Sequence, residues 1–250
     1  GIVLSKKVYE IPEGIRVNRG RNLANFINIP NGEKVTDVIC IPKNINIHSK
    51  NVLFATEKGL IKKTKLSEYQ RINQTGLKAI KISSDDSLIR VRITNGSNDI
   101  LLCSTGGKII RFDEESVRLV GRVSRGVKGM GIKSDEKVIT MEIIDDSMEL
   151  LSMTENGHGK RSLVREYRKQ TRGGMGVSAM KLTQKNGKIK AIKTVEKQDD
   201  LMVITNKGQV IRTNISEISL QGRNTQGVRI IRLKKDEKVV AVEKIAKEDE

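Results

Sequence analysis

Short apolar runs that stop at a glycine turn recur along this chain. Each is continued by a second run in which apolar and polar residues alternate, as in QVIRTNISEISL at residues 209–220. Runs of this length bounded by glycine turns are typical of β-strands and hairpins. No segment combines a sustained helical period with capping residues, so the pattern predicts a chain that is almost entirely β. The runs and their turn glycines are VLFATEKGLIKKT with Gly59, LLCSTGGKIIRF with Gly107, LLSMTENGHGKRS with Gly157 and LMVITNKGQVIRT with Gly208.

A second glycine recurs in step with the turn glycines above, and it closes a basic turn in each unit. It stands at Gly76, Gly126, Gly176 and Gly227, with spacings of 50, 50 and 51 residues. Periods of this size indicate a solenoid, a propeller or an array. After this turn come an apolar strand such as VRIIRL, an acidic turn and a further strand such as KVVAVEKI, and four strands per unit predict a propeller blade. The acidic turns are Asp85-Asp86, Asp135-Glu136 and Asp236-Glu237.

The repeat predicts a single domain, residues 1–250, because one unit cannot bury its apolar face alone. It holds about five repeats, with approximate bounds 1–50, 51–100, 101–150, 151–200 and 201–250. The first unit is longer because of an insertion at residues 41–51, and Gly1 begins in mid-motif with no apolar strand ahead of its turn. We therefore expect part of the first repeat to precede Gly1.

The net charge of the chain indicates which kind of partner it binds. The chain carries 47 Lys and Arg against 30 Asp and Glu, a formal net charge of +17, which favours a polyanion and above all nucleic acid. No run approaches the roughly 18 apolar residues of a membrane-spanning helix and the start shows no secretory signal, so we expect no membrane partner and a cytoplasmic location. Cys40 and Cys103 lie in different phases of the repeat, so we expect two buried thiols and neither a disulfide framework nor a metal cluster.

Basic residues recur at the same points of each repeat unit, as the strands do. They gather in the turn after each SEY, SEI or ESV segment and in the strand that begins with Lys-Lys or Ile-Arg. Because the repeat places equivalent residues at equivalent points of successive blades, we expect these charges to form a belt on one side of the disc. A role in solubility alone would need no phase. The candidate DNA-binding residues are Arg16, Arg19, Arg21, Lys62, Lys63, Arg71, Arg111, Arg122, Arg125, Lys128, Lys160, Arg161, Arg168, Arg172, Arg212 and Arg223.

The low aromatic content favours duplex DNA over single strands or RNA as the partner. Aromatic residues make up 2% of the chain and Trp is absent, which leaves few stacking platforms for single strands or RNA. Bending roughly 40 base pairs through half a turn costs on the order of 10 kcal/mol, so many weak phosphate contacts are required. We expect sequence-independent binding of double-stranded DNA, with a logarithmic affinity that falls with the logarithm of salt at a slope of about −0.9 per neutralised phosphate.

No set of residues predicts catalysis, a metal or a cofactor. An acidic residue recurs in each turn motif, which is expected of a blade-to-blade structural contact or a hydrogen bond at a strand end, since an active site is usually unique. His48 and His158 lie in unrelated turns without a Cys or His at ligand spacing. The segments GGMG and GHGK lack the spacing of a phosphate-binding P-loop. The recurring acidic residues are Glu68, Glu115, Glu166 and Glu217.

Five segments, in order, give the chain a resemblance to a known family. They are VYEIPEGIRVNRGRN, KGLIKKTKLSEYQR, GKIIRFDEESVRLVGRVSRGVKGM, NGHGKRSLVREYRKQTRGGMGV and GQVIRTNISEISLQGRNTQGVRIIRL. With them the whole chain resembles the C-terminal domain of the A subunit of bacterial DNA gyrase, a type IIA topoisomerase. The resemblance implies a β-pinwheel, a propeller-like disc in which neighbouring blades exchange strands, with a basic rim around which DNA is wrapped.

The same resemblance implies a role within a larger enzyme. Wrapping would let an A2B2 holoenzyme of the gyrase A and B subunits introduce negative supercoils with ATP and Mg, at the nucleoid of a bacterial cell. The strand-cleaving tyrosine of the family lies in the N-terminal part of the A subunit. This chain alone is therefore expected to have no catalytic residue, no cofactor and no enzymatic activity.

One family motif departs from its usual form. Family members carry a seven-residue box, Q-x-R-G-G-K-G, in a first repeat that would lie upstream of Gly1. The nearest match here resembles a degenerate copy, with Met where the box has Lys. It consists of Gln170, Thr171, Arg172, Gly173, Gly174, Met175 and Gly176.

Two alternatives remain open. The corresponding domain of the topoisomerase IV A subunit, which serves decatenation and relaxation, has the same fold, although the QGRNTQGV segment and the continuous repeat order look more like gyrase. A propeller-type protein-interaction scaffold would use the charge to meet an acidic partner. It predicts no bending of short duplexes and a charge belt that breaks between blades.

Overall fold

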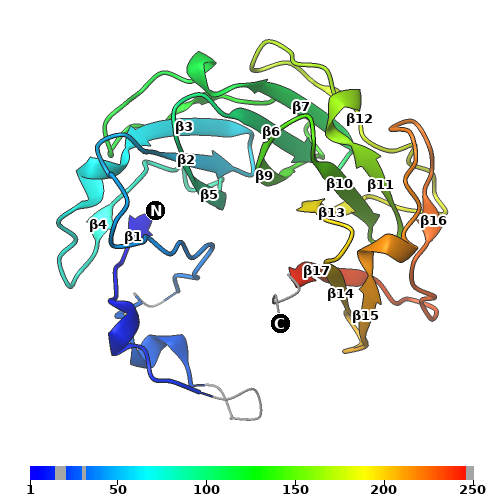
Figure 1. The fold of residues 1–250 in the computed structure, drawn as a ribbon, viewed down its shortest axis with the longest axis horizontal. Coiled ribbons are helices and arrows are strands. Elements are labelled where there is room, and N and C mark those ends of the chain that lie inside the picture. Colours follow the sequence, from blue (N-terminus) through cyan, green and yellow to red (C-terminus); the bar gives the residue numbers. More distant parts are fainter. Residues whose placement is uncertain (15–20, 30–31, 246–250) are drawn as a thin grey trace.

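Small antiparallel sheets follow one another along an arc in the computed structural model, which describes residues 1–14, 21–29 and 32–245 (Figure 1). The five sheets are called blades 1 to 5 in chain order. Helical structure within the described residues is limited to 3₁₀ turns of three or four residues. The prediction of an all-β fold with four-stranded sheets from repeats of about 50 residues is confirmed, although blades 1 and 5 contain fewer strands than expected.

Each blade is described from its innermost strand outward. Blade 1 contains only β1 (Ile2–Val3) and β4 (Leu77–Lys78) within the described residues. Blade 2 contains β5 (Leu88–Thr94), β2 (Asn51–Thr56), β3 (Leu60–Lys65) and β8 (Val127–Lys128). Blade 3 contains β9 (Val138–Ile144), β6 (Asp99–Ser104), β7 (Lys108–Asp113) and β12 (Val177–Ser178). Blade 4 contains β13 (Ile189–Val195), β10 (Glu149–Thr154), β11 (His158–Leu163) and β16 (Val228–Arg229). Blade 5 contains β17 (Val239–Ile245), β14 (Asp200–Thr205) and β15 (Val210–Asn214).

A short 3₁₀ turn follows the third strand of the blades. These turns are η3 (Leu66–Tyr69), η4 (Glu114–Ser116), η5 (Val164–Glu166) and η6 (Ile215–Glu217), and two further 3₁₀ turns, η1 (Val8–Glu10) and η2 (Leu23–Asn25), lie near the start of the chain. At η4 and η6 the preceding Asp113 and Asn214 side chains accept hydrogen bonds from the backbone N–H groups of Glu115 and Ser216. This capping explains why the strand stops at this point of the repeat.

Neighbouring blades exchange strands. In blades 2, 3 and 4 the outermost strand comes from the following repeat, so that β8 pairs with β3, β12 with β7 and β16 with β11. Gly126 stands just before β8 with φ +94°, and a Cβ at that position would lie 2.7 Å from the carbonyl oxygen of Ile61. The crossing strand therefore requires glycine there. The exchange confirms the β-pinwheel that the resemblance implies.

The exchanged strands occupy the outer side of the arc. In Figure 1, β4, β12 and β16 lie at the outer edge, while β5, β9, β13 and β17 lie toward the centre. In blade 5 no outer strand pairs with β15 in the part of the chain that the structure describes. The edge of β15 is correspondingly open, with Val210 57% exposed.

The hydrophobic core lies between blades. Along β6, Ile100 and Leu102 pack with residues of blade 2, whereas Leu101 and Cys103 pack with residues of blade 4. Both faces of the strand are therefore buried, which explains why LLCS is continuously apolar instead of alternating. The expectation of a buried thiol is confirmed for Cys103, where burial raises the pKa of the thiol. It is wrong for Cys40, which is exposed just before the insertion.

Candidate nucleic-acid interface

Five of the predicted DNA-binding residues lie inside the molecule. All five are at most 7% exposed, and a cation at that depth is not presented to a phosphate. The expectation of a surface belt is therefore wrong for these five, and each is held by contacts within the protein. They are Lys62, Lys63, Arg111, Lys160 and Arg161.

Three of the buried cations join a blade to the next repeat. Lys63 Nζ donates to the Glu114 carbonyl at 2.9 Å, Arg111 Nη1 to the Tyr167 carbonyl at 3.4 Å and Arg161 Nε to the Ile218 carbonyl at 2.6 Å. Each acceptor is at or just after the 3₁₀ turn of the following repeat. The two arginines also pair with carboxylates, Arg111 with Asp99 and Arg161 with Glu149. These three cations recur at the same position of the repeat because they make a structural contact that recurs from blade to blade.

The other two buried cations hold the loop that leads to the exchanged strand. Lys62 Nζ donates to the carbonyls of Ala79, at 2.5 Å, and of Arg122, and Lys160 Nζ donates to the carbonyl of Gly222 at 2.6 Å. No carboxylate pairs with either ammonium group in the described structure. Burial lowers the pKa of both groups to about 8.

These lysines predict that stability rises with pH above about 8. Below that pH the folded and unfolded chains both hold the two protons. Between about pH 8 and 10 the folded protein releases protons that the unfolded chain keeps, so the free energy of unfolding increases, on the order of 1–2 kcal/mol per lysine. Above about pH 10 the rise is opposed by Tyr69, because burial raises the pKa of its hydroxyl to about 12. Urea unfolding at a series of pH values measures the slope.

The control for this prediction is a pair of variants. Lys62→Met combined with Lys160→Met should flatten the slope, whereas Lys133→Met, at an exposed lysine, should leave it unchanged. An equal slope in the wild type and the double variant would contradict the assignment.

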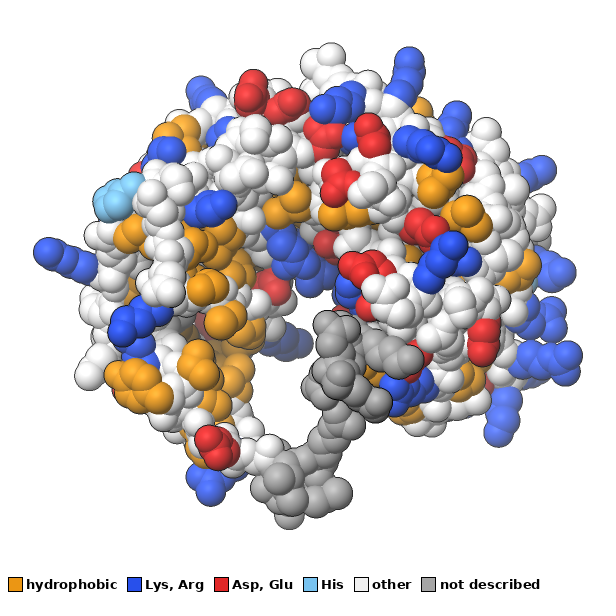
Figure 2. Space-filling view, viewed as in Figure 1, with side chains coloured by type: hydrophobic (Ala, Val, Ile, Leu, Met, Phe, Trp, Pro, Cys, Tyr) orange, Lys and Arg blue, Asp and Glu red, His pale blue; other side chains and the backbone are white. Residues whose placement is uncertain are grey.

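Nine of the remaining candidates are exposed or half-buried. Arg212 illustrates the contrast, because it occupies the same register position as Arg111 and Arg161 but lies on the open strand β15, where its side chain is 64% exposed and pairs with Asp200. Figure 2 shows Lys and Arg side chains projecting from much of the outer edge, whereas many of the Asp and Glu side chains in view lie on the face. Arg16 and Arg19 lie outside the described residues. The nine are Arg21, Arg71, Arg122, Arg125, Lys128, Arg168, Arg172, Arg212 and Arg223.

Two exposed basic residues that were not predicted from the sequence, Lys78 and Arg229, share a register position with the predicted Lys128. Lys128 on β8 faces Leu60 across the strand pair, and the equivalent positions on β4 and β16 are Lys78, opposite Ile2, and Arg229, opposite His158. All three cations are exposed. The repeat phase was the available signal, because each follows its turn glycine by two residues.

The box-like segment bridges two blades. The backbone N–H of Gln170 donates to the Arg111 carbonyl at 2.7 Å in blade 3, and that of Gly173 donates to the Gly129 carbonyl at 2.8 Å next to β8 of blade 2. Arg172 Nη1 donates to the Lys128 carbonyl. Met175 is 45% exposed. The segment therefore has a structural role in this chain, whatever else it contacts.

The last glycine of the segment offers a test of that role. Gly176 has φ +75°, and a Cβ there would lie 2.3 Å from the Ile109 carbonyl oxygen. Gly176→Ala is expected to lower the free energy of unfolding by at least about 2 kcal/mol, measured by urea unfolding. Gly121→Ala is the matched control, because nothing lies within 4 Å of its Cβ, and it should change stability by less than about 1 kcal/mol. Similar effects of the two would contradict this structural role.

Two of the recurring acids make the predicted blade-to-blade contact. Glu68 Oε2 accepts from the backbone N–H of Arg122 at 3.2 Å, and Glu166 Oε2 accepts from that of Arg223 at 2.8 Å. Glu217 contacts Thr213 of its own repeat. Glu115 is not equivalent to the other three acids, because Ser116 holds their position as the third residue of η4. The prediction is confirmed for Glu68 and Glu166.

Within residues 1–14, 21–29 and 32–245, no group of three His, Cys, Asp or Glu side chains is placed to hold a metal ion. No helix in the same ranges is long and apolar enough to cross a membrane.

Comparison with known proteins identifies the repeat. A family model described as the DNA gyrase C-terminal domain, beta-propeller, matches residues 50–95, 98–145, 149–196 and 199–246. The chain belongs to the DNA gyrase C-terminal domain family. The four matches begin at or one residue before β2, β6, β10 and β14, so each family unit contributes the hairpin, the exchanged strand and the innermost strand of this gyrase-type fold.

Curated relatives agree with this membership. The chain is 39% identical over 252 residues to the DNA gyrase A subunit of Staphylococcus epidermidis and 41% identical over 244 residues to that of Buchnera aphidicola, covering 100% and 98% of this chain. It spans 28% and 29% of the length of these relatives.

Two solved structures share the fold. The C-terminal domain of DNA topoisomerase IV superposes with a TM-score of 0.85 at 26% identity, over 95% of this chain and 74% of that one. A DNA gyrase A C-terminal domain superposes with a TM-score of 0.76 at 22% identity, over 92% of this chain and 76% of that one.

Proposed function

We propose that this chain is a non-catalytic domain that binds, bends and wraps duplex DNA around its outer edge without sequence specificity. The register of the exchanged strands carries the proposal. Lys78, Lys128 and Arg229 hold one position on β4, β8 and β16, and all three are exposed. The equivalent residue on β12, the outer strand between β8 and β16, is Ser178. Exposed cations on three of the four outer strands that the structure describes match a curved path of phosphates.

We further propose that the domain works within the A subunit of an A2B2 gyrase holoenzyme, together with the B subunit. Wrapping would present a neighbouring DNA segment to the cleavage site, which lies elsewhere in the A subunit, with a fixed hand. ATP-driven strand passage would then introduce negative supercoils in the bacterial cytoplasm. The names of the gyrase relatives and the 28% of their length that this chain spans support the assignment. The division into one domain of five repeats stays a prediction.

Ring closure of short duplexes by a ligase tests the wrapping proposal. The 250-residue chain should accelerate circle formation at low salt, and its affinity should fall linearly on a double-logarithmic plot against salt. It should show no turnover of ATP. Absence of any bending signal at low salt would favour a scaffold for an acidic protein, and ATP hydrolysis by the pure chain would contradict the non-catalytic assignment.

The topoisomerase IV domain is the second candidate, and the TM-score of 0.85 to such a domain favours it. The two candidates differ in outcome for the assembled enzyme. A complete A subunit carrying this domain, combined with its B subunit, should introduce negative supercoils into relaxed plasmid if the gyrase proposal holds. Relaxation and decatenation without supercoiling would support topoisomerase IV.

A further inference from the structure

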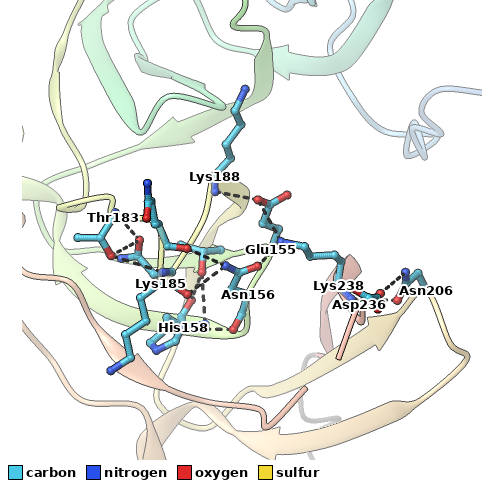
Figure 3. A network of polar contacts seen from close by, with 12 residues as sticks. Glu155, Asn156, His158, Thr183, Lys185, Lys188, Asn206, Asp236 and Lys238 are labelled. Carbon is cyan, nitrogen blue, oxygen red and sulfur yellow. Dashed lines mark hydrogen bonds and ion pairs between the residues drawn. The ribbon is translucent and has the colours of Figure 1, made fainter. Parts of the chain in front are cut away.

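An open hollow of about 430 Å³ lies against blade 4. His158, the first residue of β11, stands opposite Arg229 of β16 in the exchanged pair, and both line the hollow. The turn at residues 183–187, which leads into β13, supplies Lys185 and Asn186, and Arg232 lies just beyond β16. In Figure 3 the Lys185 side chain extends past His158. This site is called the basic hollow below.

The basic hollow exists because blade 4 lacks an acidic turn. Blades 2, 3 and 5 enter their innermost strands through Asp85-Asp86, Asp135-Glu136 and Asp236-Glu237, whereas blade 4 has Lys185-Asn186 at this point. In blade 5 the acid Glu237 accepts from Thr205 Oγ1 at 2.6 Å. In blade 4 the neutral Asn186 accepts from the backbone N–H of Thr183 at 2.6 Å. The blade 4 turn is one residue longer, because its backbone closes from Gly187 N–H to the Thr183 carbonyl, whereas the blade 5 turn closes from Glu237 N–H to the Lys234 carbonyl. At this point blade 4 has a positive charge where blades 2, 3 and 5 have negative charges.

The charges that line the basic hollow are unbalanced. Lys185, Arg229 and Arg232 are exposed and make no ion pair within the described part of the chain, and no carboxylate lines the hollow there. Glu155, in the adjacent hairpin turn, points away from His158 in Figure 3 and pairs with Lys238 at 3.5 Å. An anion entering the hollow would meet three cations and no competing acid.

The lining is held in place by the side-chain amides of a buried residue, Asn186, and a half-buried one, Asn156. The Asn186 side chain is 1% exposed and donates to the Lys181 carbonyl at 2.9 Å. Asn156 Nδ2 donates to the Lys185 carbonyl at 3.0 Å. The turn that carries Lys185 is therefore fixed before any ligand arrives, which lowers the entropy cost of binding.

His158 adds a proton-linked donor. Its Nδ1 lies 3.3 Å from the Asn156 carbonyl, and because a carbonyl only accepts, Nδ1 carries the proton of the neutral ring. Nε2 then has a lone pair, and it can donate to an anion only after taking up a second proton. Burial, together with Arg229 and Lys185, lowers the pKa of the ring in the free protein. An anion among the same cations would favour the proton and raise that pKa.

We propose that the basic hollow seats one phosphate group of the wrapped DNA backbone, with Lys185, Arg229 and Arg232 as counter-charges and His158 as a donor that is protonated on binding. The proposal rests on the proposed function and deepens it, because it names a discrete phosphate seat within the wrapping path. Binding of DNA should therefore be accompanied by the uptake of a proton by His158. Affinity should rise as the pH falls, since binding and protonation are linked.

The first measurement uses inorganic sulfate, a tetrahedral oxyanion whose charge does not change between about pH 5.5 and 8. Titration into the 250-residue chain, followed by NMR of the His158 ring, should shift Nε2 and raise the pKa of His158. Lys185→Gln and Arg229→Gln should each weaken sulfate binding at least about threefold. The His48 ring, which is exposed in the insertion, serves as the internal control and should not respond.

The second measurement uses a short DNA duplex at constant salt. Affinity of the wild type should increase at least about threefold from about pH 7.5 to 6. His158→Gln, which cannot be protonated, should remove this increase, and His48→Gln should retain it.

The outcomes separate the two proposals. If duplex binds with full affinity while His158→Gln keeps the pH dependence, or if sulfate leaves the His158 ring unmoved, the basic hollow is not a phosphate seat and wrapping stands. If the wild-type chain binds no duplex at low salt, both proposals fail.

Discussion

Arg161→Met is expected to lower the free energy of unfolding by about 3–5 kcal/mol, because it leaves the Glu149 carboxylate, whose side chain is only 14% exposed, without its partner. Arg161 is 6% exposed, and its guanidinium contacts Glu149 Oε2 at 2.6 Å and the Ile218 carbonyl at 2.6 Å. Methionine fills much of the volume but supplies no donor to either oxygen. The loss should appear in urea unfolding as a lower midpoint.

The matched control is Arg212→Met. Arg212 holds the equivalent position on β15 and also pairs with an acid, Asp200, but its side chain is 64% exposed. An exposed ion pair contributes about 0–1 kcal/mol, so Arg212→Met should be nearly neutral. Equal destabilisation by the two substitutions would show that burial at the exchange site does not decide the role of this arginine. At temperatures where Arg161→Met is folded, its DNA affinity should keep the wild-type salt slope.

Neutralising four exposed cations should have the largest effect on DNA. We expect the combined variant Arg71→Gln, Arg125→Gln, Lys128→Gln and Arg168→Gln to reduce the slope of log affinity against log salt by about 3.6, which corresponds to a loss of three to four decades of affinity near 0.1 M salt. All four side chains are exposed. Arg125 donates a hydrogen bond to Ser83 Oγ at 3.3 Å. Stability should therefore change little.

A second quadruple variant controls for net charge. Lys58, Lys137, Lys188 and Lys238 each lie within 4 Å of a carboxylate: Asp85, Glu57, Asp135 and Glu155 respectively. Changing these four lysines to Gln removes the same charge but from sites that an acid already neutralises. Duplex titrations over a range of salt should show a much smaller change. Equal losses in the two variants would mean that DNA responds to net charge alone, and the outer edge would not be its path.

The period and the turns could be predicted from the sequence because both depend on local chemistry. A glycine in a left-handed turn is required by the backbone, and Gly59, Gly107, Gly157 and Gly208 all have positive φ. Apolar runs buried on two faces remain recognisable without knowing what covers them. The sequence pattern does not specify, however, which blade receives the strand after the basic turn, since every hairpin offers the same edge.

The burial of five of the predicted basic residues could not be deduced from their positions in the repeat. Arg161 and Arg212 are equivalent in the repeat, and only the repeat that follows Arg161 covers it. A weaker signal was available one residue earlier. Lys62, Ile110, Lys160 and Ile211 occupy one register position, and a site that accepts either lysine or isoleucine is typical of the interior, where a long aliphatic stem packs and its ammonium reaches a carbonyl.

The exchange of strands also sets an order for synthesis on the ribosome. β11 emerges with its own hairpin partner β10, but its outer neighbour β16 follows only about one repeat later in the chain. Until its successor has been translated, a blade therefore has one strand edge and its buried cations uncovered. Growth of the arc proceeds in one direction, and each new repeat completes the blade made before it.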